Sequence, residues 1–142
     1  MKTKYYLIIL MFFFGLPIFA QRDTIALNTN WQFKIDKKTE GFDKLWFSNN
    51  WNDGRVVTVP HTWNIEKENE THYGWGWYQK KLFVPAKWKN KQLVLQFGAI
   101  NHTATIYVNG KKVKENIGDG FNKFFINLDG VLNFNADNTI TV

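Results

Sequence analysis

Two alternating apolar stretches within residues 91–113 constrain the fold more than any other feature of the chain. Apolar residues stand at every second position from 93 to 97 and again from 104 to 108. This spacing predicts strands with one buried face. Asn109-Gly110 follows the second stretch and predicts a two-residue hairpin turn, because both central positions of a type I′ turn need a positive φ.

The rest of the chain carries short strand signals at regular spacing and no long helical period. Further strands are predicted over 24–27, 31–35, 56–59, 77–84, 124–128 and 138–142. Residues 44–47 fit either a short helix or a packed loop, and 66–71 and 115–120 predict polar loops. Many short strands predict an all-β sandwich, and long crossing loops favour a jelly roll. We expect the last strand, which stops at Val142, to lack a return partner and to expose an edge.

Composition excludes several classes of site. The chain has no cysteine, which excludes disulfides, zinc–thiolate sites and thiol nucleophiles. Its three histidines, His61, His72 and His102, have no metal-ligand spacing, so neither a metal nor a cofactor is expected. The lysines are spread out rather than gathered into a dense basic face, which argues against nucleic-acid binding. Aromatic residues are abundant at 18%, and they suit both sandwich cores and sugar sites.

Residues 1–20 predict a secretory signal peptide. Lys2 and Lys4 give a positive start, and residues 5–14 form an unbroken apolar run. The run is too short to span a bilayer, which needs roughly 20 apolar residues. We therefore expect a periplasmic or secreted protein with no membrane association after cleavage. Its mature domain would be 21–142, with a net charge of 6 − 2 = +4 after the two lysines are removed.

No stretch carries a known catalytic motif. Glycoside hydrolysis needs two carboxylates on opposite sides of the scissile bond. Glu66, Glu68 and Glu70 lie in a polar loop, and we interpret them as a solvated face rather than as catalytic groups. No catalytic residue is nominated.

Four motifs in order resemble the N-terminal sugar-binding domain of family-two glycoside hydrolases, which include β-galactosidases, β-glucuronidases and β-mannosidases. They are Val59-Pro60-His61-Thr62-Trp63-Asn64, Gly76-Trp77-Tyr78-Gln79-Lys80 with Phe83-Val84-Pro85, the run from Lys89 to Asn101, and Tyr107-Val108-Asn109-Gly110-Lys111. The resemblance covers nearly all of the mature chain. It implies a galactose-binding-like jelly roll that precedes an immunoglobulin-like domain and a TIM barrel carrying two catalytic glutamates. No part of the barrel lies in this sequence, so we expect the front piece of a longer enzyme, truncated and inactive by itself.

The resemblance also implies where the carbohydrate substrate binds. In β-galactosidases of this family an Asn that follows the Gly-Val/Ala step hydrogen-bonds the terminal sugar, and Asn101 stands at that place. Its amide offers both a donor and an acceptor to sugar hydroxyls. The alternative role for Asn101 is to cap a turn. His102, beside it, is the second substrate-binding candidate.

Some positions depart from the family pattern and leave the specificity open. Gln79 replaces the Arg usual in β-galactosidases and is more like glucuronidases. Further departures are Lys114, Asn116, Asp119 and Asn127. The Pro-His-Thr-Trp segment and Asn101 favour a β-galactosidase. A β-glucuronidase or β-mannosidase relative, a free-standing carbohydrate-binding module and a surface adhesion domain are the alternatives.

Overall fold

The computed structural model describes residues 22–142, so the predicted signal peptide lies outside the described residues. The strands are β1 (Trp31–Asp36), β2 (Arg55–Val57), β3 (Trp75–Val84), β4 (Val94–Phe97), β5 (Thr103–Val108), β6 (Lys111–Ile117), β7 (Phe124–Asn127) and β8 (Ala136–Thr141). Two single-turn 3-10 helices, η1 (Trp63–Ile65) and η2 (Ala86–Trp88), lie between strands. Within residues 22–142, no helix has the length and apolar character needed to cross a membrane.

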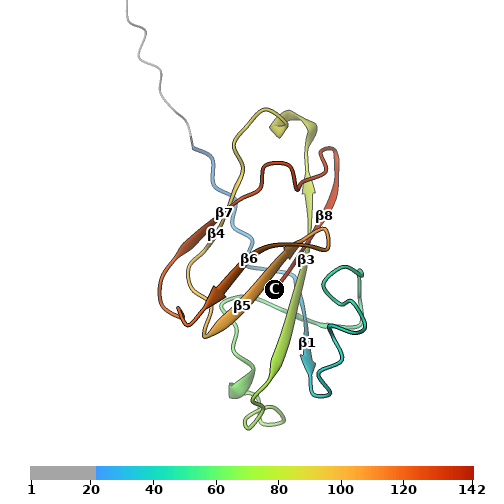
Figure 1. The fold of residues 1–142 in the computed structure, drawn as a ribbon, viewed down its shortest axis with the longest axis vertical. Helices are drawn as coiled ribbons and strands as arrows, with labels where there is room; N and C mark the ends of the chain where they lie inside the picture. The colour runs from blue at the N-terminus through green and yellow to red at the C-terminus, as the bar shows by residue number, and fades with distance from the viewer. Residues whose placement is uncertain (1–21) are drawn as a thin grey trace, which may run out of the picture.

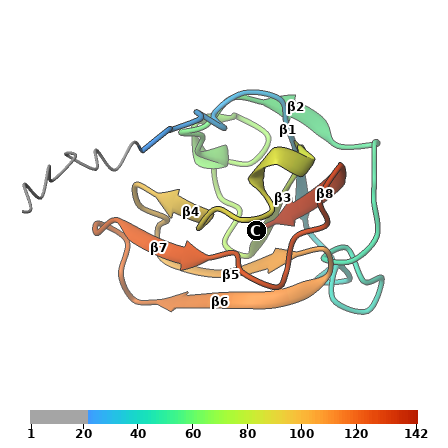
Figure 2. The same ribbon diagram turned by 90° about the horizontal axis from the view of Figure 1, so that it is seen from above.

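The strands form two antiparallel sheets that face each other (Figure 1). The larger sheet has the order β2-β1-β3-β8-β5-β6, and β4 pairs with β7 in the smaller one. Figure 2 shows the larger sheet curling from β1 and β2 past β8 to β5 and β6, with β4 and β7 closing the open side. This arrangement confirms the predicted all-β jelly-roll sandwich.

The predicted apolar faces form the core between the sheets. Leu95 on β4 and Ile126 on β7 are buried against the larger sheet. The larger sheet contributes Trp31, Phe33, Ala104, Ile106, Val108 and Ile140 to the same cluster. Each fully buried large apolar side chain contributes about 1.5–3 kcal/mol to stability, so the two alternating stretches of the sequence supply much of what holds the sheets together.

The Asn109-Gly110 turn has the predicted geometry. Asn109 has a φ of 52° and Gly110 a φ of 78°, the left-handed values of a type I′ turn. The Asn109 side chain also ties the turn to β8, because its Oδ1 accepts from the Thr139 amide at 3.0 Å. Its Nδ2 donates to Asn138 Oδ1 at 2.8 Å. The hairpin is therefore fixed both by its own backbone and by the neighbouring strand.

Three strand predictions are wrong in position or extent. Residues 24–27 form no strand, because this exposed segment makes only isolated hydrogen bonds. An example is the hydrogen bond from Trp31 Nε1 to Leu27 O at 2.6 Å. The strand predicted over 56–59 is β2 and ends at Val57. The strand β6 runs on to Ile117, into a predicted loop, because β5 pairs with it along its whole length.

The last strand is not an edge strand, contrary to the prediction. β8 lies between β3 and β5 and pairs with both. The ladder with β3 extends to Val142, whose amide donates to Tyr78 O at 2.8 Å. The alternation of residues 138–142 predicts a strand but carries no information about its neighbours, and this is why the prediction failed.

Candidate functional site

Two loops that cross between the sheets meet at one end of the sandwich. Residues 98–102 connect β4 to β5, and residues 118–123 connect β6 to β7. At this end Thr103 pairs with Ile117 in the larger sheet, and Phe97 pairs with Phe124 in the smaller one. The four strand ends therefore converge there. We call residues 98–102 and 118–123 the rim.

Both predicted substrate-binding residues lie exposed in the rim. The Asn101 side chain packs on Gly120 of the other loop, so closely that a Cβ at Gly120 would stand 2.6 Å from Asn101 Oδ1. His102 Nδ1 lies 3.4 Å from Thr103 Oγ1. The peptide bond between Asn101 and His102 is cis. Within residues 22–142, no hydrogen bond joins their side chains, so the structure places them side by side but links only Asn101 to the second loop.

The second rim loop is ordered by Asp119. Its Oδ1 accepts from the backbone amide of Asn122 at 3.2 Å and from Asn122 Nδ2 at 3.0 Å. Asn116 Nδ2 donates to Asp119 O at 2.7 Å. Asn116 and Asp119 are two of the departures from the family pattern, and this hydrogen bond places them in contact. The loop leaves Phe121 92% exposed.

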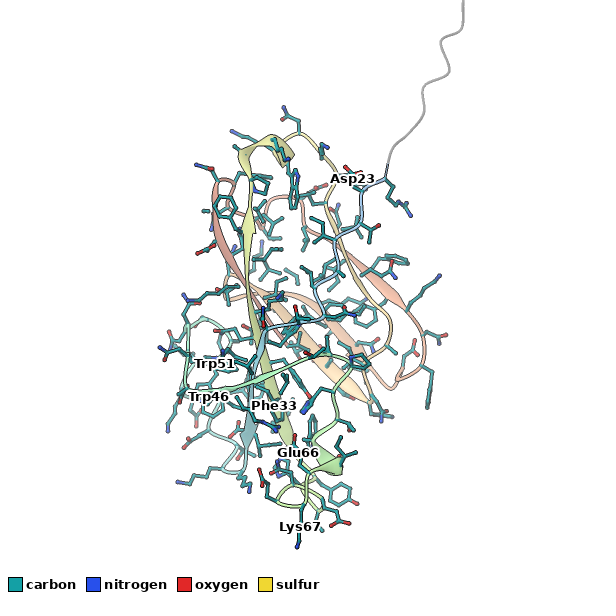
Figure 3. All side chains as sticks on the ribbon, turned by 180° about the vertical axis from the view of Figure 1, so that it is seen from behind. Asp23, Phe33, Trp46, Trp51, Glu66 and Lys67 are labelled. Carbon is teal, nitrogen blue, oxygen red and sulfur yellow. The ribbon has the colours of Figure 1, made fainter. Side chains whose placement is uncertain are left out.

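A polar cluster that the sequence did not reveal holds the loop between β2 and β3 (Figure 3, near Glu66). Glu66 is paired with Arg55, and it accepts from Asn69 Nδ2 at 2.8 Å. His61 bridges Glu66 and the hydroxyl of Tyr78, with ring-nitrogen distances of 3.1 and 2.8 Å. The interpretation of Glu66 as solvated is wrong, since its side chain is only 16% exposed.

The electrostatics of this cluster suit structure rather than proton transfer. The hydrogen bond from Arg55 lowers the pKa of Glu66 to about 2, and bonds from Asn69 and His61 act in the same direction. Burial raises the pKa of Tyr78 above its usual range, and the charge of Glu66 adds to this. A general acid needs a raised carboxyl pKa. Glu66 therefore stays ionised and holds the loop in place.

A second group missed by sequence reasoning lies on the outer face of the larger sheet, where residues 37–53 cover it. Lys34 Nζ lies 4.1 Å from the ring centroid of Trp46 and 5.3 Å from that of Trp51. It also pairs with Asp53 at 2.9 Å. Figure 3 shows Trp46 and Trp51 together beside β1. Residues 37–53, called the outer segment below, have no periodic pattern that would have predicted this packing.

The described residues offer no cluster of metal ligands: in 22–142, no group of three or more His, Asp or Glu side chains is placed to hold a metal ion. The expectation that the chain needs no metal or cofactor stays a prediction.

A comparison with known protein families identifies the family of this chain. Residues 67–142, more than half of the chain, match the model described as "Glycosyl hydrolases family 2, sugar binding domain". The chain belongs to this family. Three of the four sequence motifs lie within the matched residues.

Individual relatives are glycoside hydrolases of two kinds. A β-glucuronidase of Bacteroides fragilis is 30% identical over 133 residues, covering 91% of this chain and 17% of that protein. A β-galactosidase of Thermoanaerobacterium thermosulfurigenes is 29% identical over 127 residues, covering 85% and 17%. The structure of a Lactobacillus rhamnosus β-glucuronidase superposes with a TM-score of 0.74 at 36% identity, covering 81% of this chain and 20% of that one. The chain thus spans about a fifth or less of the length of these relatives.

Proposed function

We propose that this chain is the sugar-binding domain of a β-glucuronidase, an exo-acting enzyme that releases terminal β-linked glucuronic acid. The observation that carries the proposal is the similarity to β-glucuronidases over 91% of the chain in sequence and 81% in structure. It replaces the β-galactosidase preference, which rested on Asn101 and on the Pro-His-Thr-Trp segment.

The role proposed for the domain is to supply the rim of the active site and not the catalytic carboxylates. Asn101 offers an amide donor and acceptor, and the His102 ring offers a further polar nitrogen. Lys123 adds a positive charge to the same rim. Such groups suit a sugar with hydroxyls and a carboxylate. Glu66, held ionised in its cluster, has no part in the reaction.

Gln79 replaces the Arg usual in β-galactosidases, and its contacts support a structural role for this residue. Its side chain is buried, accepts from the Trp51 amide at 3.2 Å and donates to Asn49 O at 2.9 Å. It lies on the outer face of the sheet beneath the outer segment. The residue therefore holds that segment and does not read the substrate, so it carries no argument about which sugar is bound.

A comparison of two chromogenic substrates tests the proposal. The complete gene product is assayed with p-nitrophenyl β-D-glucuronide and with the matching β-D-galactoside. We expect kcat/KM to favour the glucuronide by a factor of about a hundred or more, since a site built to bind a charged group discriminates strongly against substrates that lack it. Equal rates on both substrates, or no hydrolysis of the glucuronide, would contradict the proposal.

The second candidate is a β-galactosidase, favoured by the relative from Thermoanaerobacterium thermosulfurigenes. The same assay decides between the two, because a galactosidase reverses the substrate preference.

We also propose that the protein is exported, on the basis of the charged start and apolar run of residues 1–20. N-terminal sequencing of the mature protein would then begin at Gln21. A mature protein that keeps Met1 in the cytoplasmic fraction would contradict export.

A further inference from the structure

A hollow of about 330 Å³ lies on the outer face of the larger sheet, next to the outer segment and separate from the rim. It is lined by amide side chains, a tryptophan and two lysines, namely Asn30, Gln32, Trp51, Asn52, Gln79, Lys80 and Lys81. Its volume falls at the small end of the range found for small-molecule sites. Amide groups with an aromatic ring are the chemistry that binds sugar hydroxyls and the apolar face of a sugar ring.

Two glutamines line the hollow, and they differ in their hydrogen bonding. Gln32 on β1 and Gln79 on β3 are direct cross-strand partners, so their side chains share one face of the sheet. The Gln79 amide is fully engaged, with bonds to Trp51, Asn49 and Thr141. Gln32 Oε1, by contrast, is buried and is the one such side-chain atom in residues 22–142 without a hydrogen-bond partner.

An unpartnered buried carbonyl is costly, and binding can relieve that cost. A buried acceptor without a donor costs about 1–3 kcal/mol. The terminal torsion of a glutamine amide is soft, so a partial rotation about χ3 can open Oε1 to the hollow without burying Nε2 in its place. A hydroxyl that enters the hollow then donates to it. Ligand binding would thus supply the hydrogen bond that the protein itself leaves unmade.

Trp51 is held in place before any ligand arrives. Its Nε1 donates to Trp46 O at 3.0 Å, and its backbone amide donates to Gln79 Oε1. Gly54 leaves space for the ring, because a Cβ there would stand 2.6 Å from Trp51 Cζ3. A tryptophan held by a ring hydrogen bond and a backbone hydrogen bond loses little conformational entropy when a sugar packs on it.

A positive charge at the hollow favours a sugar that carries a carboxylate. Lys81 lies on the same face as Gln79, two residues along β3, and its side chain is exposed. Lys80, the other lysine of the hollow, donates to Thr29 O at 2.7 Å, whereas Lys81 forms no ion pair within residues 22–142. We propose that the hollow is a second carbohydrate site that binds a uronic acid, with its hydroxyls on Gln32 and Asn52, its ring against Trp51 and its carboxylate at Lys81. The site is additional to the proposed active-site rim and does not depend on the reaction assigned to it.

Calorimetric titration of the complete gene product with D-glucuronic acid tests the site. We expect two binding events per chain, of which only one is displaced by a competitive inhibitor of the enzyme. Gln32→Leu is expected to abolish the event that the inhibitor does not displace and to leave hydrolysis unchanged. It should not lower the thermal unfolding midpoint, because replacing an unpartnered polar group by an apolar one of similar size removes a cost. Asn101→Ala is expected to weaken the other event only.

Lys81→Gln gives an independent variant at an exposed position, with Lys87→Gln as the matched control. Lys81→Gln should weaken D-glucuronate at the second site about tenfold and leave D-glucose binding unchanged, since only the uronate offers a charge to pair. A single binding event in the wild type, or two events unaffected by Gln32→Leu and Lys81→Gln, would overturn the site and leave the hollow to water. Because the readout is binding, the site is tested even if the chain proves to serve another hydrolase.

Discussion

The outer segment, residues 37–53, and the rim, residues 98–102 and 118–123, both lack regular secondary structure, yet they are held in different ways. The outer segment is fixed by polar side chains that rise from the sheet beneath it. Asp36, at the end of β1, accepts from the amides of Glu40 and Gly41 at 2.9 Å each and from Trp77 Nε1 at 3.1 Å. In the rim, the hydrogen bonds run between residues that are close in sequence, as between Asp119 and Asn122.

This difference indicates what each region does. A buried carboxylate with three donors determines where the outer segment lies, and removing it leaves several groups unsatisfied at once. The rim keeps Asn101, His102 and Phe121 exposed, and these side chains remain available to a ligand. We therefore expect substitutions in the outer segment's anchors to change stability, and substitutions in the rim to change binding.

The largest effect is expected for Asp36→Ala. The change leaves the amides of Glu40 and Gly41 and the Trp77 indole without their acceptor, and should lower the free energy of unfolding by about 3 to 5 kcal/mol. Urea unfolding followed by tryptophan fluorescence measures it. Asp43→Ala, an exposed position in the same segment, is the matched control and should shift the free energy by less than about 0.5 kcal/mol. Equal effects of the two variants would show that the segment is not anchored through Asp36.

Glu66→Gln is expected to have the next largest effect, because the loop between β2 and β3 is anchored by that carboxylate. Near neutral pH the variant should lose about 2 kcal/mol, the typical contribution of hydrogen bonds to a charged group. The pKa of Glu66 is lowered in the folded state, from 4.5 to about 2. The stabilisation is therefore complete above pH 4.5 and is lost as the pH falls towards 2.

Unfolding of the wild type and of Glu66→Gln at several pH values checks this. The difference in stability between them should shrink from pH 4.5 towards pH 2. Glu68→Gln, two positions away and exposed, should follow the wild type throughout. A difference that persists at pH 2, or that is absent at neutral pH, would be incompatible with the anchoring role.

Sequence reasoning predicted the sheets better than it predicted the side-chain contacts that hold the loops in place. The alternation at 93–97 and 104–108 and the Asn109-Gly110 turn are local signals, and each carries its own geometry, so the core and the hairpin were predictable. The pairing of Glu66 with Arg55, eleven residues away, is not encoded in any spacing. The position of β8 between β3 and β5 likewise depends on long-range order, which a single strand pattern does not contain.

The candidate site, likewise, could be predicted only in part. Asn101 and His102 lie between the strand signals at 93–97 and 104–108, and their exposure at a sandwich end could be predicted from that position. The convergence of two crossing loops, and the packing of Asn101 on Gly120, could not. Nor does any local pattern reveal that Gln32 and Gln79, 47 positions apart in the chain, face each other across two strands.

A smaller effect is expected for Lys34→Met, which keeps the apolar stem but removes the charge between Trp46, Trp51 and Asp53. The ion pair with Asp53 is largely exposed on the acid side, so the loss should be about 0.5–1 kcal/mol. The hydrogen bond from Lys34 lowers the pKa of Asp53, and the variant should return that pKa towards its ordinary value. Carboxyl titration by NMR measures the second effect, and Lys38→Met is the exposed control. An Asp53 pKa that does not rise in Lys34→Met would rule out the pairing in solution.

The smallest change in stability, and the most informative one for the comparison, is expected for Asn101→Ala. The side chain is exposed, and its removal should change the free energy of unfolding by less than about 0.5 kcal/mol. If the rim contacts the sugar, the same variant should raise KM for the glucuronide about tenfold in the complete gene product, because one sugar hydroxyl loses its partner. Asn90→Ala, an exposed asparagine near η2, should change neither quantity. If Asn101→Ala lowered the stability as Asp36→Ala does and left KM unchanged, Asn101 would be a turn cap, its alternative role. It would then not be a substrate contact.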